Sequence, residues 1–164
     1  MRILAIDPGF GRCGVAVLDG TSSAAELLYS DCIETHANTE FSERLAHVAE
    51  GVAQLIKEYQ PEYIALEELF FSNNAKTVFR VAEIRGMLIY LAVENSIPLV
   101  EYNPLTVKIA LTGFGKASKE QVIKMVPKLI ELKKIPKYDD EYDAIALGIT
   151  ALAQSKNRAI YNDK

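Results

Sequence analysis

Near its start the chain reads Ile3-Leu4-Ala5-Ile6-Asp7-Pro8-Gly9, a short apolar run that ends in a carboxylate and a turn. An apolar run of this length, closed by Pro and Gly, is typical of a buried strand. A second apolar run, Gly14-Val15-Ala16-Val17-Leu18, follows the glycine-rich turn, so the two runs predict a hairpin. Residues 25–34 can supply a third strand after the turn at Asp19-Gly20. We therefore expect the fold to begin with three strands in a meander.

Apolar spacing farther along the chain predicts two more strands and four helices. The strands are the apolar runs at residues 63–67 and 97–102. The helices have apolar side chains at intervals of three and four, and they cover residues 45–56, about 75–91, the segment behind the capping-box pair Ser118 and Gln121, and the segment from about Asp140. Pro127 should kink the third helix. This order predicts an α/β fold with a mixed five-stranded sheet and helices on its faces.

Length and composition favour one domain over residues 1–164. The chain has 164 residues and 49% apolar content, which is enough to bury a core without a metal or a cross-link. Its longest apolar stretches are too short for a membrane span, and the apolar run after Arg2 is too short for a secretory signal. Cys13 and Cys32 match neither a zinc spacing nor a C-x-x-C motif. We read them as reduced thiols and expect a cytoplasmic protein with no membrane contact.

The charge of the chain is unevenly distributed. The net charge of −4 by itself argues against nucleic-acid binding, because phosphate contacts need cations. Residues 76–137, however, contain eleven Lys or Arg against five Glu, a local charge of +6. A simple alternative is that Lys124, Lys128, Lys133 and Lys134 only solvate the outer face of a helix. The middle of the chain is therefore a candidate for phosphate contacts.

Four carboxylates are candidates for one site. Asp7 and Glu67 each end a predicted strand, and both would emerge at one edge of the sheet if those strands are parallel neighbours. Asp140 and Asp143 are three residues apart at the start of a helix and share a face of it. Each also has a structural alternative as a turn residue, a helix cap, a partner of the helix dipole or an exposed strand end.

A cluster of four acids favours divalent cations. Unpaired like charges repel, and hard ions such as Mg²⁺ relieve this repulsion through oxygen ligands. Two ions about 3.5–4 Å apart can activate a water and stabilise the leaving oxygen in phosphodiester hydrolysis. Composition alone does not select the ligands, because Glu68, Asp139 and Glu141 stand beside the four candidates.

With these residues the sequence resembles the RuvC family of Holliday-junction endonucleases, which have the RNase H-like fold. The resemblance runs in order along nearly the whole chain. It rests on these segments: Ile3-Leu4-Ala5-Ile6-Asp7-Pro8-Gly9, Pro61-Glu62-Tyr63-Ile64-Ala65-Leu66-Glu67, Phe70-Phe71, Arg85-Gly86, Val107-Lys108, Gly113-Phe114-Gly115, Lys119 with Gln121-Val122, and Asp140-Glu141-Tyr142-Asp143-Ala144.

The resemblance implies roles for seven residues. The metal-binding catalytic acids of the family match Asp7, Glu67, Asp140 and Asp143, with Glu67 chosen over Glu68. Lys108 and Lys119 match basic residues that approach the DNA backbone near the cleavage site. Phe70 matches an aromatic residue that stacks on bases opened at the junction. The implied cofactor is Mg²⁺, two ions in each site, with Mn²⁺ as a substitute.

The implied partners are four-way junction DNA, a second copy of the chain, and the RuvA and RuvB branch-migration proteins. Two sites in a homodimer match the near two-fold symmetry of a junction. The long helix at about residues 75–91 would help to form the dimer interface, although its apolar residues also fit a core helix.

Three positions depart from the family pattern. Cys13 stands where threonine is common, and Ala82-Glu83-Ile84 replaces a more usual Gly-Gln-Ala. Phe10 is unusual within the glycine-rich turn, and the sequence leaves open whether it packs or touches DNA. These departures bear on sequence preference and on fit to the junction.

The sequence thus predicts metal-dependent cleavage of Holliday junctions by paired symmetrical nicks, in DNA recombination and repair. Its nearest alternative is an RNase H-like nuclease that acts on another branched DNA or on an RNA/DNA hybrid. A junction-binding protein without nuclease activity is a second alternative. A third is an actin-like or sugar-kinase-like ATPase, which the chain of 164 residues is too short to form as two lobes.

Overall fold

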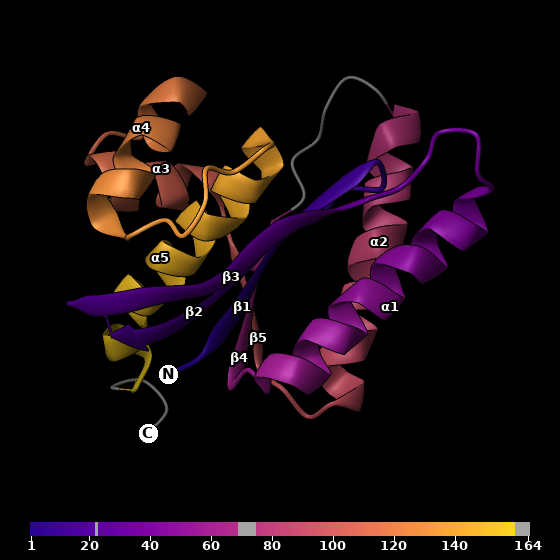
Figure 1. Cartoon of the computed structure of the whole chain (residues 1–164), viewed down its shortest axis with the longest axis horizontal. Coiled ribbons are helices and arrows are strands. Elements are labelled where there is room, and N and C mark those ends of the chain that lie inside the picture. The colour runs from indigo at the N-terminus through magenta and orange to yellow at the C-terminus, as the bar shows by residue number, and fades with distance from the viewer. Residues whose placement is uncertain (22, 69–74, 160–164) are drawn as a thin grey trace.

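The computed structural model describes residues 1–21, 23–68 and 75–159, with the side chains of residues 75–76 and 156–159 outside the description. Its strands are β1 (Ile3–Asp7), β2 (Arg12–Thr21), β3 (Ala24–Glu34), β4 (Tyr63–Glu67) and β5 (Leu99–Tyr102). Its helices are α1 (Phe41–Tyr59), α2 (Ala75–Glu94), α3 (Pro104–Thr112), α4 (Lys119–Leu129) and α5 (Asp139–Ala159) (Figure 1).

The five strands form one mixed sheet in the order β3-β2-β1-β4-β5. Strands β1, β2 and β3 are an antiparallel meander, as the sequence predicted, with a register shift between Val17 and Leu18. Strand β4 pairs parallel to β1, and β5 pairs parallel to β4. Ile6 lies opposite Leu66 in the β1–β4 register, so the next residues, Asp7 and Glu67, end neighbouring strands at one edge of the sheet. The sequence prediction of an α/β fold with a mixed five-stranded sheet is confirmed.

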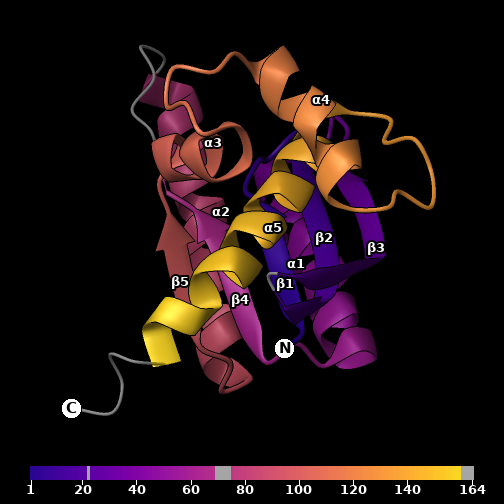
Figure 2. The same ribbon diagram turned by 90° about the vertical axis from the view of Figure 1, so that its left-hand side faces the viewer.

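Helices cover both faces of the sheet. Helix α5 crosses one face and packs with α3 and α4, whereas α1 and α2 lie against the other face (Figures 1 and 2). Along β1 the side chains alternate between the two cores: Ile3 and Ala5 face α5, and Leu4 and Ile6 face α1 and α2. All four are fully buried. A strand buried on both faces explains why β1 reads as a continuous apolar run.

Helix α3 was not predicted from the sequence, which placed only two helices after β5. Its start has clear local signals, because the Asn103 side chain accepts a hydrogen bond from the Leu105 backbone N–H at 2.8 Å and Pro104 takes the first helical position. Its apolar residues, however, lie on all sides: Val107 and Leu111 are buried, but Leu105 and Ile109 are about half exposed. A helix without a one-sided apolar pattern gives little periodic signal.

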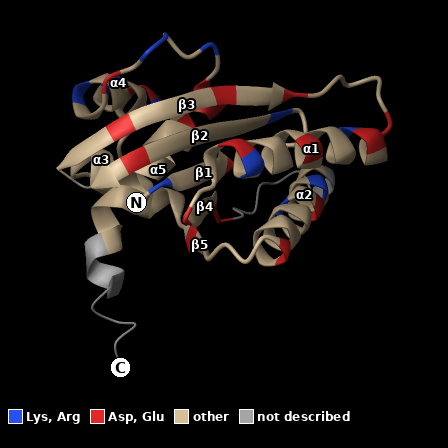
Figure 3. Ribbon diagram, turned by 60° about the horizontal axis from the view of Figure 1, so that its bottom comes forward, with Lys and Arg blue, Asp and Glu red and all other residues tan. Residues whose placement is uncertain are grey.

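The end of α4 corrects a second sequence interpretation. Lys133 and Lys134 were read as the outer face of a helix, but α4 ends at Leu129 and both lysines lie in the loop after it. Figure 3 shows Lys and Arg on α4 and on that loop, and Asp and Glu along β3. The loop pairs with this edge strand: Lys133 with Glu26 at 3.5 Å, Lys134 with Asp31 at 3.6 Å, and Lys137 with Glu34 at 3.2 Å. Much of the basic charge here is therefore already paired.

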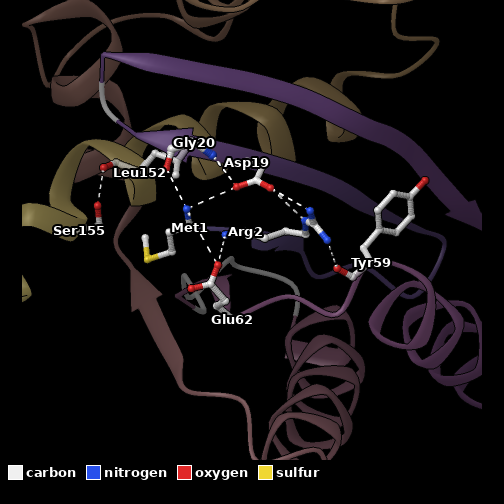
Figure 4. Close-up of polar contacts among 8 residues, drawn as sticks. All are labelled: Met1, Arg2, Asp19, Gly20, Tyr59, Glu62, Leu152 and Ser155. Carbon is white, nitrogen blue, oxygen red and sulfur yellow. Dashed lines mark hydrogen bonds and ion pairs between the residues drawn. The ribbon is translucent and has the colours of Figure 1, made fainter.

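Arg2 lies at the start of β1, at the end of the sheet opposite Asp7 and Glu67 (Figure 4). Its guanidinium pairs with Asp19 at 2.9 Å and donates to the Tyr59 carbonyl oxygen at 2.8 Å, which joins β1, β2 and the end of α1. The Arg2 backbone N–H donates to Glu62 at 2.9 Å. These contacts hold the start of β1 against β2 and the end of α1.

Cys13 and Cys32 are both free thiols. Burial raises the pKa of each to about 12, so neither is a reactive thiolate at neutral pH. Among the described residues, no helix has both the length and the apolar character to cross a membrane.

Candidate active site

Asp7 and Glu67 lie side by side because β1 and β4 are parallel neighbours that stop at the same edge. Each carboxyl group lies close enough to the other to affect its pKa. Burial raises the pKa of Asp7 well above its ordinary value, and the charges of Glu67, Asp143 and Asp140 raise it further. Burial also raises the pKa of Glu67, although the hydrogen bond from Asp7 opposes this. Burial and the neighbouring carboxylates therefore disfavour the charged form of Asp7.

The first turn of α5 supplies Asp140 and Asp143. Helix α5 begins at Asp139, so Asp140 is inside the first turn rather than at its cap. The turn comes very close to β2, because a Cβ atom built on Gly14 would lie 2.0 Å from the Asp140 carbonyl oxygen. Gly14 pairs directly with Asp7 across β1 and β2. Only glycine at this position lets the start of the helix reach the edge of the sheet that carries Asp7.

Asp140 faces Arg12, the first residue of β2. Arg12 Nε lies 2.9 Å from Asp140 Oδ2, and this buried oxygen accepts no hydrogen bond from the described residues. Burial raises the pKa of Asp140, and the Arg12 charge opposes this. The Arg12 guanidinium also lies 4.8 Å from the centre of the Tyr138 ring. Asp140 thus faces a cation through a buried oxygen.

Asp143 shares Lys119 with Asp139. Lys119 Nζ lies 2.7 Å from Asp143 and 2.8 Å from Asp139. Burial would lower the pKa of Lys119, but the two carboxylates outweigh burial and raise it, so the lysine stays charged. Burial raises the pKa of Asp143, whereas Lys119 lowers that of Asp139. Asp139 therefore holds the ammonium group independently of Asp143.

A pocket of about 180 Å³ opens beside these groups. The charged residues in its lining are Glu67, Lys108, Lys119 and Asp143, and its apolar wall is Pro104, Val107 and Val122. Helix α3 supplies Lys108 and α4 supplies Lys119, so the helix that the sequence did not predict forms part of the site. The pocket places two cations next to two of the acids.

Glu67 and Glu68 are adjacent in sequence but have different contacts. The Glu68 side chain accepts a hydrogen bond from Asn103 at 3.1 Å, which ties it to the start of α3. Arg85 from α2 is buried, donates to the Glu67 carbonyl oxygen and pairs with Glu101 of β5. Glu67 is thus held by its backbone with its carboxylate turned to Asp7. Phe70, the predicted base-stacking residue, lies outside the described residues.

Phe10 packs within the protein. Its ring meets the Phe41 ring edge to face, with 6.2 Å between ring centres, and Arg44 lies 4.7 Å above its centre. Arg44 also donates to the Phe10 carbonyl oxygen at 3.0 Å. The turn after Asp7 is therefore braced against the start of α1.

The four acids suit a divalent ion in their chemistry but do not form a finished coordination shell. Among the described residues, no group of three or more His, Cys, Asp or Glu side chains is placed to hold a metal ion. Arg12 and Lys119 instead lie against Asp140 and Asp143. The raised pKa of Asp7 and the unsatisfied Asp140 Oδ2 both indicate a cluster that gains from an added cation.

The model of the family "Crossover junction endodeoxyribonuclease RuvC" matches residues 3–151. The chain belongs to the RuvC family. Over 163 residues it is 42% identical to RuvC of Brachyspira hyodysenteriae, covering 99% of both chains. It is also 42% identical over 149 residues to RuvC of Moorella thermoacetica, covering 91% of this chain and 89% of the relative. T. thermophilus RuvC, solved in complex with a Holliday junction substrate, superposes with a TM-score of 0.89 and 30% identity over 96% of each chain.

Sequence reasoning missed three contributors to the site of this RuvC family member. Arg12 carries a detectable signal, since it opens the strand that pairs with β1 at the edge of Asp7. The contact of Asp139 with Lys119 joins two segments twenty residues apart, and no local pattern reveals it. Gly14 reads as an ordinary strand residue until α5 is seen against it.

Proposed function

We propose that this RuvC family member is an endonuclease that resolves Holliday junctions by paired symmetrical nicks, in DNA recombination and repair. The observation that carries the proposal is the meeting of four carboxylates at one edge of the sheet, in a chain that superposes on a junction-bound RuvC over 96% of its length. A protein that only bound junctions would have no need for acids that repel one another and the DNA phosphates.

The proposed ligands of Mg²⁺ are Asp7, Glu67, Asp140 and Asp143, with Mn²⁺ as a substitute. Two ions in the site would supply a water of lowered pKa and would stabilise the leaving oxygen. Asp7 and Glu67 would hold a cation in their ionised forms, which burial disfavours while no cation is bound. The charges of Arg12 and Lys119 oppose the rise that burial causes in the pKa of Asp140 and of Asp143.

The cations of the pocket act on the DNA backbone in this proposal. Lys119 and Lys108 line the pocket next to Glu67 and Asp143, where a scissile phosphate would lie. They orient the phosphate for in-line attack by water and offset its developing charge, and the products are a 5′-phosphate and a 3′-hydroxyl. Asp139 keeps Lys119 in place when Asp143 turns to a ligand. Phe70 is proposed to stack on bases opened at the junction.

A second copy of the chain is proposed to cover α2. Phe79, Tyr90 and Val93 are 70%, 60% and 72% exposed, and helical spacing places them on one stripe. Gly86 lies on the same stripe with open space beside it, so another helix can approach closely. Glu83, an unusual acid for the family, also lies there and pairs with Arg80 at 3.0 Å. RuvA and RuvB as partners, and a cytoplasmic location, complete the proposal.

The test is cleavage of a synthetic mobile four-way junction with Mg²⁺, beside linear duplex and an RNA/DNA hybrid. Two adjacent glutamates give a matched pair of variants. Glu67→Gln should abolish cleavage, whereas Glu68→Gln should still produce paired nicks that ligase can reseal. Cleavage of the hybrid but not of the junction would show that the proposed substrate is wrong. Tight junction binding without any cleavage would show that the protein binds junctions but is not a nuclease.

A further inference from the structure

Glu141, in the first turn of α5, is buried more deeply than the aspartates beside it. Glu141 stands between Asp140 and Asp143 in sequence, yet its exposed fraction is 0%, whereas the side chains of Asp140 and Asp143 are 23% and 27% exposed. Successive helical residues are about 100° apart around the axis, so Glu141 leaves the helix on a different side from the two aspartates. That side faces the edge strand β3 and the loop before α5.

Both oxygens of Glu141 have partners, and none of the partners belongs to α5. Ser30 Oγ of β3 donates to Oε1 at 2.7 Å in a buried contact. The Lys137 backbone N–H donates to Oε2 at 3.2 Å. Lys134 Nζ lies 3.4 Å from Oε1 and 3.6 Å from Asp31 of β3. One carboxylate thus ties the start of α5 to the edge strand and to the preceding loop.

Burial of the Glu141 carboxylate costs free energy. A buried charge loses its hydration, and a buried ion pair seldom stabilises a fold more than apolar side chains of the same volume. The contacts of Glu141 add orientation instead. Hydrogen bonds to both of its oxygens fix the rotation of the helix about its own axis. Close packing of α5 against Gly14 fixes the distance of the turn from the sheet, but it does not by itself fix this rotation.

We propose that Glu141 is a positioning residue that sets the rotation of the first turn of α5, so that Asp140 and Asp143 face Asp7 and Glu67. The inference rests on the proposed function, since it concerns the same four acids. A small rotation of this turn moves both aspartates together. Groups that hold metal ligands in place typically change metal affinity or activity by about 10- to 100-fold when they are removed.

The test compares Glu141→Gln and Ser30→Ala with a control, Glu131→Gln. The control makes the same chemical change as Glu141→Gln, but at an exposed residue of the loop between α4 and α5. Titration of Mn²⁺ into the DNA-free protein by calorimetry gives metal affinity, and cleavage at a series of Mg²⁺ concentrations gives the metal midpoint. We expect Glu141→Gln to lower the Mn²⁺ affinity and to raise the Mg²⁺ midpoint of cleavage, each by about tenfold or more. Ser30→Ala should shift both quantities in the same direction by less. Junction binding in EDTA should stay within about twofold of the unmodified chain in every variant.

A purely structural role would give a different result. Glu141→Gln and Ser30→Ala would then lower thermal stability while the metal midpoint of the folded protein stayed that of Glu131→Gln, and this outcome overturns the proposal. If Glu141→Gln fails to fold, Ser30→Ala decides alone, since it deletes one hydrogen bond and keeps the charge. If the unmodified chain does not cut junctions, the proposed function fails, and the calorimetric titration still tests the positioning role.

Discussion

Replacing Asp7 with Asn should make the metal-free protein more stable while it abolishes cleavage. In the absence of divalent ions, Asp7 is buried against Glu67, and burial followed by the charges of Glu67 and Asp143 raises its pKa. A carboxyl group whose pKa is higher in the folded state opposes folding once the pH exceeds its unfolded value. Asn keeps the shape and removes the charge. We expect a gain of about 1–2 kcal/mol at pH 7.5, or about 2–8 °C in midpoint for a chain of this size.

The sign of this difference depends on pH and on metal. Asp7 contributes stability, relative to its ionised form, below the ordinary pKa of 3.8, and that contribution is lost as the pH rises through the raised folded value. The advantage of Asp7→Asn should therefore vanish near pH 4 and grow toward neutral pH. A saturating divalent ion should reverse the order, since an ion present at 100 times its dissociation constant stabilises the unmodified chain by about 2.7 kcal/mol.

Thermal and urea unfolding in EDTA, from pH 4 to pH 8 and again with Mg²⁺, measure this difference. Asp19→Asn is the control of opposite sign. Burial alone would raise the pKa of Asp19, but its contacts with Arg2 and the Gly20 backbone lower it, so its ionised form supports folding and the variant should be less stable. Should Asp7→Asn unfold at a lower temperature than the unmodified chain in EDTA at pH 7.5, the idea of a repelling metal-free cluster is wrong.

Three further substitutions probe the rest of the site and the proposed dimer face. Lys119→Met should slow single-turnover cleavage by about 10²-fold, as expected for a group that offsets transition-state charge, with Lys116→Met, an exposed lysine, as the comparison. Gly14→Ala should lower stability by about 1–3 kcal/mol, because its Cβ would lie 2.0 Å from the Asp140 carbonyl oxygen. Urea unfolding checks this change. Phe79→Glu should turn a dimer into a monomer in sedimentation velocity, and an unchanged sedimentation coefficient would argue against the α2 interface.

The sheet and the strand-borne acids could be predicted from sequence because their signals are local. A run such as Ile3-Leu4-Ala5-Ile6 is buried on both faces, and a charge at its end marks where the strand leaves the core. The parallel pairing of β1 and β4 then places Asp7 beside Glu67 without further information. Family resemblance predicted a role for Lys119, and the structure adds the two aspartates that hold it.

The contacts that complete the site could not be predicted, because they join segments far apart in sequence. Helix α3 has apolar residues on every side, so its periodicity is weak although it carries Lys108. Lys134 belongs to a lysine-rich segment that resembles a solvated helix face, yet it reaches β3 and the buried Glu141. Spacing alone also cannot show that Glu68 turns to Asn103 while Glu67 turns to Asp7.

The charges around the four acids limit their mutual repulsion. Burial and the neighbouring carboxylates raise the pKa of Asp7, while Arg12 and Lys119 lie against Asp140 and Asp143. Binding of the same ions by all four carboxylates would require their ionised forms, and Arg12 and Lys119 would then share their partners with the metal. Asp139 keeps Lys119 and its positive charge at the pocket during that exchange. Metal binding should therefore release protons, and it should do so without expelling the lysine that the phosphate needs.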